Sequence, residues 1–188
     1  MATTLTLISH GSTEALRRAA FPADEPLERF GARDGARARE RLRRFDRAWV
    51  APELRARQTA AALGIEAAVE PALRDLDSGS WAGKGLAEIA PQLLAVWLND
   101  TAPPPHGGET VTALIARVAD WMKSPIGEGH CAAVTHPAIL RAAIVHAIGA
   151  DASAFRRIDV APLDAAVLSF SDRWRFRSLA PLAEPSVD

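Results

Sequence analysis

The sequence predicts an α/β protein in which a three-layer sandwich places helices on both faces of a mostly parallel central sheet. Short apolar runs of strand length alternate with longer helical patterns, which is typical of parallel strands joined by crossover helices. The 188 residues, 48% of them hydrophobic, suffice for one substantial core. We therefore expect a single domain over residues 1–188, with residues 76–108 as a loop and helical insert over its functional site.

The first half of the chain opens with the apolar and β-branched run TTLTLI, which suits a buried strand. Gly64 marks the end of a helix, and the proline and three glycines of residues 71–85 indicate a loop with extended pieces. In chain order we expect a strand at 3–8, a helix at 27–45, a strand at 46–50, a helix at 53–63 and a short strand at 67–69.

The second half contains the clearest periodicity. Val111, Leu114, Ile115, Val118 and Met122 recur at helical spacing, which predicts an amphipathic helix from Thr110 onward. A later helix is framed by a proline at its first residue and a glycine after its last. The other expected elements are short helical segments at 86–98, a strand at 131–135, a helix at 137–148, and strands at 165–170 and 174–177.

The composition disfavours a nucleic-acid-binding, membrane or secreted protein. The net charge of −1 gives no global field for a nucleic acid or a membrane surface. Cys131 is the only cysteine, so no internal disulfide can form. Residues 1–20 lack a secretion-signal pattern, and no segment has the roughly 20 apolar residues that cross a bilayer. We expect a cytoplasmic protein with neither a nucleic-acid nor a membrane partner.

Two histidines follow expected strands. His10 follows the first strand, and His136 follows the strand at 131–135. A parallel sheet can bring both to its carboxyl edge, where open α/β sheets bind ligands. A single histidine at such a place is more often structural, but two of them suggest a nucleophile and a charged partner.

An arginine and an aspartate are further candidates for a site at this edge of the sheet. Arg55 opens the helix after the second strand, and its guanidinium suits a phosphate. Asp75 could donate a proton to a leaving group, but Asp77 is an equal rival at this point. A metal site is disfavoured, because an extended segment would separate His130 and His136 by about 20 Å.

In their order along almost the whole chain, these segments resemble the histidine phosphatase superfamily, the phosphoglycerate mutase-like group. The resemblance rests on five segments: Ile8-Ser9-His10-Gly11-Ser12-Thr13, similar to the family's Arg-His-Gly opening; Pro52 to Ala60, around Arg55; Leu73-Arg74-Asp75 through Gly83; Gly107-Gly108-Glu109-Thr110; and Val134-Thr135-His136 with Arg141.

The resemblance implies His10 as the nucleophile that accepts a phosphoryl group, with Arg55 and His136 neutralising the phosphate oxygens. Asp75 would be the general acid, where many members carry glutamate. A hydrogen bond from the other ring NH of His10 to a carbonyl would keep its attacking nitrogen unprotonated. The implied phosphate-binding residues are Arg55, Gly11, Thr13, Ser9, Arg18 and Glu109. No metal or cofactor is implied; the partner is a small phosphorylated substrate, and the oligomeric state stays open.

The chain departs from the family pattern at its opening motif. Ser9 replaces the arginine before the catalytic histidine, which would lower the rate roughly ten- to 150-fold. Arg17 or Arg18 could supply the missing charge. Leu16 replaces a frequent asparagine, and Pro137 replaces a glycine. Two functions follow: a phosphomonoester hydrolase acting through phosphohistidine, or a non-catalytic phospholigand-binding or scaffolding protein.

Overall fold

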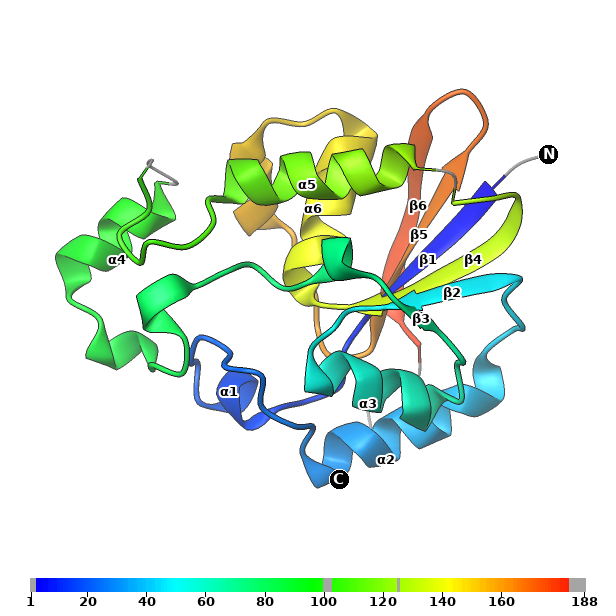
Figure 1. Ribbon diagram of the computed structural model, residues 1–188, viewed down its shortest axis with the longest axis horizontal. Coiled ribbons are helices and arrows are strands. Elements are labelled where there is room, and N and C mark those ends of the chain that lie inside the picture. Colours follow the sequence, from blue (N-terminus) through cyan, green and yellow to red (C-terminus); the bar gives the residue numbers. More distant parts are fainter. Residues whose placement is uncertain (1–2, 100–102, 125, 183–188) are drawn as a thin grey trace.

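A computed structural model describes residues 3–99, 103–124 and 126–182, in which six strands form a mixed, mostly parallel sheet (Figure 1). The strand order is β3-β2-β4-β1-β5-β6; the first four strands run parallel, and β5 and β6 join antiparallel. The predicted α/β class is confirmed. The strands are β1 (Thr3–Ser9), β2 (Arg47–Val50), β3 (Ala68–Val69), β4 (Gly129–Thr135), β5 (Asp164–Phe170) and β6 (Trp174–Pro181).

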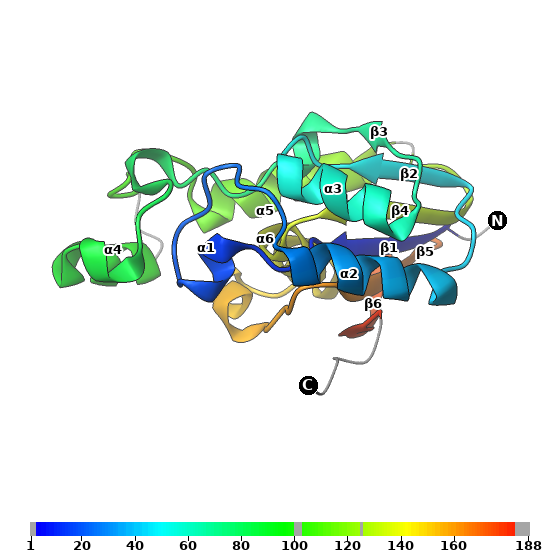
Figure 2. The same cartoon turned by 90° about the horizontal axis from the view of Figure 1, so that it is seen from below.

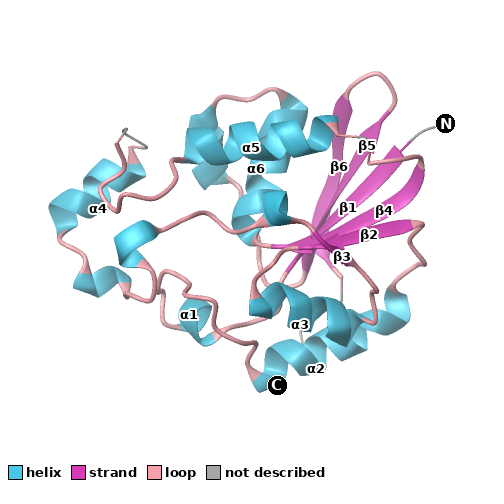
Figure 3. Ribbon diagram, viewed as in Figure 1, coloured by secondary structure: helices cyan, strands magenta, loops and turns pink. Residues whose placement is uncertain are grey.

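Helices cover both faces of the sheet (Figure 3). The pair α2 and α3 lies on one face, and α5 and α6 lie on the other (Figures 1 and 2). The helices are α1 (Glu14–Arg17), α2 (Arg29–Ala38), α3 (Leu54–Leu63), α4 (Pro91–Leu98), α5 (Val111–Lys123) and α6 (Pro137–Ile148). Short 3-10 turns are η1 (Arg39–Arg41), η2 (Pro71–Leu73), η3 (Gly79–Trp81), η4 (Leu86–Glu88) and η5 (Ala152–Arg157). Both α1 and α4 lie beyond the carboxyl ends of the strands (Figure 2).

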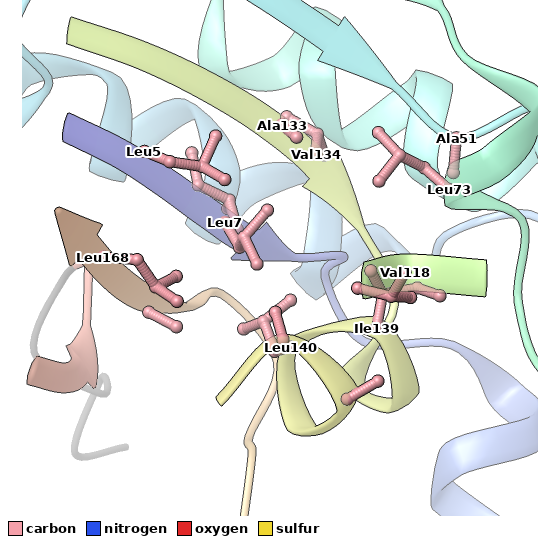
Figure 4. Close-up of a cluster of buried hydrophobic side chains, with 14 of the residues drawn as sticks. Leu5, Leu7, Ala51, Leu73, Val118, Ala133, Val134, Ile139, Leu140 and Leu168 are labelled. Carbon is pink, nitrogen blue, oxygen red and sulfur yellow. The ribbon is translucent and has the colours of Figure 1, made fainter. Parts of the chain in front are cut away.

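The core lies between the central strands and their covering helices. Leu5 and Leu7 of β1 and Leu168 of β5 approach Leu140 of α6, and all four are fully buried (Figure 4). Burying a leucine side chain contributes about 1.5–3 kcal/mol. This packing fixes the carboxyl ends of β1 and β4. The two candidate histidines follow directly after these ends.

The first long helix is shorter than predicted. The sequence indicated residues 27–45, but α2 ends at Ala38 and continues only as the turn η1. Leu42 then adopts an extended backbone and packs against the core, which ends the helical path. The two glycines of α2 allow close packing. A Cβ on Gly31 would lie 2.7 Å from the Ser12 carbonyl oxygen, so this helix can lie against the loop that follows β1.

Several element ends also differ from the prediction. The short helix α1 was missed, although Thr13 accepts the Leu16 amide as its N-cap. Asp46 lies just before β2, where its carboxylate accepts the amide of His130. At the other end of the chain, β6 runs four residues past the expected Arg177, to Pro181.

No helix in the described segments combines the length and apolar character needed to cross a bilayer.

Candidate active site

His10 follows β1 and is held in one orientation. Its amide donates to the Thr135 carbonyl at 2.8 Å, continuing the β1–β4 pairing. Its Nδ1 lies 2.8 Å from the Gly11 carbonyl oxygen. A carbonyl only accepts, so Nδ1 carries the proton and Nε2 is left with its lone pair. Burial and the neighbouring His136 lower the pKa of His10 to about 4. A neutral imidazole of this tautomer is the form that attacks phosphorus.

We expect His10 to stay neutral, as the Nδ1–H tautomer, down to about pH 4. An unfolded histidine takes up a proton near pH 6.5, so the free energy of unfolding should fall as pH decreases from 6.5 towards 4. Long-range ¹H–¹⁵N NMR of the histidine-labelled protein, assigned with His10→Gln, measures both tautomer and titration. Protonation of His10 with a midpoint near 6.5 would contradict the expectation.

His136 faces His10 across the strand ends. It follows β4 at the start of α6, and the register pairs Ser9 with Thr135, so the residues after them are neighbours. The two imidazole centroids are 5.3 Å apart. Carboxylates meet both nitrogens of the buried His136 ring: Glu53 Oε2 lies 2.7 Å from Nε2, and Asp75 Oδ2 lies 3.4 Å from Nδ1.

Arg55 is a buried cation with unused donors. It sits in the first turn of α3, only 1% exposed, and its Nη2 donates to Asp75 Oδ2 at 2.6 Å. Its Nε and Nη1 have no hydrogen-bond partner within the described residues, and Glu25 Oε2 lies 3.9 Å from Nη1. Buried hydrogen-bond donors are rarely left without partners, so Nε and Nη1 of Arg55, free among the described residues, indicate a binding site for an anionic ligand.

Asp75, rather than Asp77, lies beside the histidines. Burial raises the pKa of the Asp75 carboxyl, but the charges of His136 and Arg55 outweigh burial and leave the pKa lowered. The unliganded protein therefore holds a carboxylate at this position. Asp77 instead accepts the Gly79 amide at 2.8 Å and serves an exposed turn.

Two glutamates at the site were not foreseen. Glu53 accepts the Asp75 amide at 3.0 Å as well as facing His136. Burial raises the pKa of Glu53, but the hydrogen bond from His136 outweighs it, so the pKa is lowered. The sequence signal for Glu53 was its place before the first turn of α3, two residues from Arg55. Glu25 lies in an irregular segment that carries no periodic signal.

Gly11 and Thr13 of the opening motif make hydrogen bonds within the protein, whereas the Ser9 side chain makes none among the described residues. The Gly11 amide, an expected phosphate donor, donates to Thr59 Oγ1 at 3.0 Å in this structure. Thr13 is buried as the cap of α1. Ser9 is fully buried, and its Oγ has no hydrogen-bond partner within the described part of the chain.

Three predicted charged contacts need correction. Arg18 is exposed and pairs with Glu14, and Arg17 is exposed and pairs with Glu28, so neither supplies the charge missing at Ser9. Glu109 pairs with Arg117 at 2.7 Å, away from His10. Arg117 also donates to the carbonyl oxygens of Ala72, Arg74 and Asp75, which makes this ion pair a support of the Asp75 loop.

His10 opens onto a cavity of about 380 Å³, called the His10 pocket below. Asp75 and Arg141 are among its polar lining residues. Arg141 donates through Nε to the Ile158 carbonyl, and burial lowers its pKa. Arg141 therefore brings a positive charge to the pocket, whereas Arg17 and Arg18 do not line it.

Across residues 3–99, 103–124 and 126–182, no three or more histidine, cysteine, aspartate or glutamate side chains are grouped as metal ligands. His130 and His136 lie at opposite ends of β4, as the extended-strand argument required.

A mostly parallel sheet whose strand ends present two facing histidines and a buried arginine defines a class of protein suited to binding an oxyanion. The model of the histidine phosphatase superfamily (branch 1) matches residues 5–180, and the chain belongs to this superfamily.

Part of the chain is similar to a longer mycobacterial protein. The bifunctional protein Rv2228c of Mycobacterium tuberculosis is 37% identical over an alignment of 128 residues, and the match covers 62% of this chain and 35% of that protein. The chain thus matches about a third of that relative's length.

Solved structures share the fold. TTHB049 from Thermus thermophilus is 26% identical with a TM-score of 0.77, covering 95% of this chain and 99% of that one. The mycobacterial glucosyl-3-phosphoglycerate phosphatase Rv2419c is 22% identical with a TM-score of 0.82, over 94% and 97% of the two chains, a likeness that shows the fold alone.

Proposed function

We propose that the protein is a phosphomonoester hydrolase that forms a phosphohistidine at His10 and acts on a small phosphorylated metabolite. The observation that carries the proposal is the neutral His10 ring, with Nε2 unprotonated, beside the buried Arg55 and its unused donors. A nucleophile and fixed cationic donors are what covalent phosphoryl transfer requires.

The proposed reaction has two steps. His10 Nε2 attacks phosphorus, the P–O ester bond breaks, and the departing oxygen takes a proton from Asp75. Water then attacks the phosphohistidine, its proton returns to Asp75, and inorganic phosphate leaves with the N–P electron pair restored to His10. Arg55, His136 and Arg141 stabilise the phosphoryl oxygens during both steps.

Asp75 must acquire its proton when substrate binds. In the free protein, the charges of Arg55 and His136 keep its pKa low. A phosphate dianion between these groups compensates those charges and brings a negative charge near Asp75, which favours the protonated carboxyl. Substrate binding thus prepares the general acid.

The proposal includes a single metal-independent domain over residues 1–188, with residues 76–108 over the site, and a cytoplasmic location. Apolar side chains from this insert, Leu86 and Trp97 among them, line the His10 pocket. The lone cysteine is buried and free, which is consistent with a reducing compartment.

Trapping the covalent intermediate tests the mechanism. The protein mixed for seconds with a ³²P-labelled phosphomonoester and quenched in alkaline detergent should carry acid-labile, alkali-stable label on His10. His10→Gln should carry none, whereas His130→Gln, which alters an exposed histidine at the far end of β4, should be labelled like the native protein. Turnover without labelled His10 would contradict the covalent route.

A second candidate is a non-catalytic phospholigand-binding or scaffolding protein. The replacement of the motif arginine by Ser9 favours it, as do the carboxylates of Glu25, Glu53 and Asp75 around Arg55 and His136. Saturable phosphate binding by calorimetry, with neither label nor hydrolysis above the His10→Gln background, would favour this binder over the enzyme.

A further inference from the structure

The His10 pocket has a mostly apolar lining, and its apolar side chains are called the apolar wall below. Eleven of its 17 lining residues are apolar, and they come from segments far apart in the sequence. The apolar wall includes Leu16, Phe21, Leu76, Leu86, Trp97 and Pro137.

The side chains of the apolar wall are held by contacts with their neighbours, and some of them are exposed to solvent. Phe21 and Trp97 pack ring against ring with centroids 5.3 Å apart, and Arg156 lies over the Trp97 ring at 4.1 Å and donates to its carbonyl. Leu16 and Leu86 are 45% and 42% exposed beside the cavity. Apolar surface held open next to a reactive group is typical of a ligand-binding site.

The polar side chains of the lining are few, and most of them already have one hydrogen-bond partner in the protein. Five of the six already have partners in the protein: His10 with the Gly11 carbonyl, Thr13 with the Leu16 amide, Glu25 with the Ala23 amide, Asp75 with Arg55, and Arg141 with the Ile158 carbonyl. Hydroxyl groups of a polyhydroxylated substrate that face the apolar part of the lining would lose hydrogen bonds to water without regaining them there.

We infer that the His10 pocket takes phosphomonoesters of apolar alcohols, with the phosphate at His10 and an alkyl or aryl group against Leu16, Leu86 and Trp97. The inference rests on the proposed phosphatase function and names its substrate class. A cavity of about 380 Å³ lies at the lower end of the range for small-molecule pockets, which favours a short alkyl chain or a single aromatic ring.

A homologous series of alkyl phosphates measures how much contact with the apolar wall contributes to kcat/KM, because the leaving group stays a primary alcohol throughout. The kcat/KM should rise about fourfold for each methylene from ethyl to hexyl phosphate, because each buried methylene is worth about that factor. Hexyl phosphate should exceed glucose 6-phosphate, which also has six carbons, by more than about tenfold.

Leu86→Gln should reduce the dependence on chain length, because it places an amide on the wall. Leu93→Gln is the matched control: Leu93 is 43% exposed, close to the exposure of Leu86, but does not line the pocket, so its series should follow that of the native protein. Hydrolysis that ignores chain length, or prefers glucose 6-phosphate, would overturn the inference and leave the phosphatase proposal standing.

Binding of alkylphosphonates separates the two proposals. These probes carry a phosphorus–carbon bond and are not hydrolysed, so calorimetry with methyl- to hexylphosphonate reports the pocket alone. If no ester is turned over and His10 is never labelled, the phosphatase proposal fails. Affinity that rises with chain length then still supports the apolar pocket, and affinity that does not rise overturns it.

Discussion

Replacing His10 with glutamine is expected to reduce phosphomonoester hydrolysis by roughly 10⁴-fold or more, the scale at which loss of a covalent nucleophile acts in other enzymes. The loss should appear in kcat, because His10 is the proposed acceptor of the phosphoryl group. His136 is the nearest imidazole, but its Nε2 is engaged by Glu53 at 2.7 Å. Steady-state release of inorganic phosphate measures the effect.

The substitution should leave the fold intact. Glutamine can donate an amide hydrogen to the Gly11 carbonyl that His10 Nδ1 now serves, and it adds no charge. Thermal unfolding monitored by circular dichroism and binding of inorganic phosphate verify this. His130→Gln should keep native activity. Hydrolysis by a folded His10→Gln protein within tenfold of native would show that His10 is not the nucleophile.

The sequence was informative where chemistry follows regular structure. His10 and His136 could be placed together because each ends an apolar strand, and parallel neighbours bring such ends to one edge. Arg55 followed in the same way from the helix after β2. In each case, periodicity located the element, and the topology of a parallel sheet located its end.

The ion-pair partners of charged side chains could not be predicted from the sequence in this way. Glu109 pairs with Arg117 and Arg18 pairs with Glu14, and these pairings depend on how loops and helices fold onto one another. Glu25 reaches Arg55 from a segment without regular structure. The sequence pattern also placed the end of α2 too late, at residue 45, because the extended backbone at Leu42 depends on packing against the core.

These contacts give the site an unusual charge balance. Glu25, Glu53 and Asp75 surround Arg55 and His136, so part of the cationic capacity is already neutralised before a phosphate arrives. A phosphate dianion must compete with Asp75 for Arg55, and repulsion from the remaining carboxylates weakens its binding. The missing arginine at position 9 would have offset one of these charges.

Ser9→Arg is therefore expected to raise kcat/KM by roughly ten- to 150-fold, the worth of one charged hydrogen bond in the transition state. The change sacrifices no hydrogen bond, because Ser9 Oγ has none within residues 3–99, 103–124 and 126–182. Ser9 is fully buried, so the larger side chain should cost about 1–3 kcal/mol of stability. Initial rates of hydrolysis and thermal unfolding are measured together.

Ser9→Met separates charge from size in this test. Methionine adds a long side chain at the same buried position without a charge, so it should lower stability similarly and leave kcat/KM at or below the native value. If kcat/KM rises in Ser9→Arg but not in Ser9→Met, the gain comes from the guanidinium charge rather than from side-chain size. If Ser9→Arg folds and binds phosphate more tightly, yet hydrolysis does not accelerate, then the missing charge does not limit turnover, and the carboxylates around Arg55 and His136 become the next groups to neutralise.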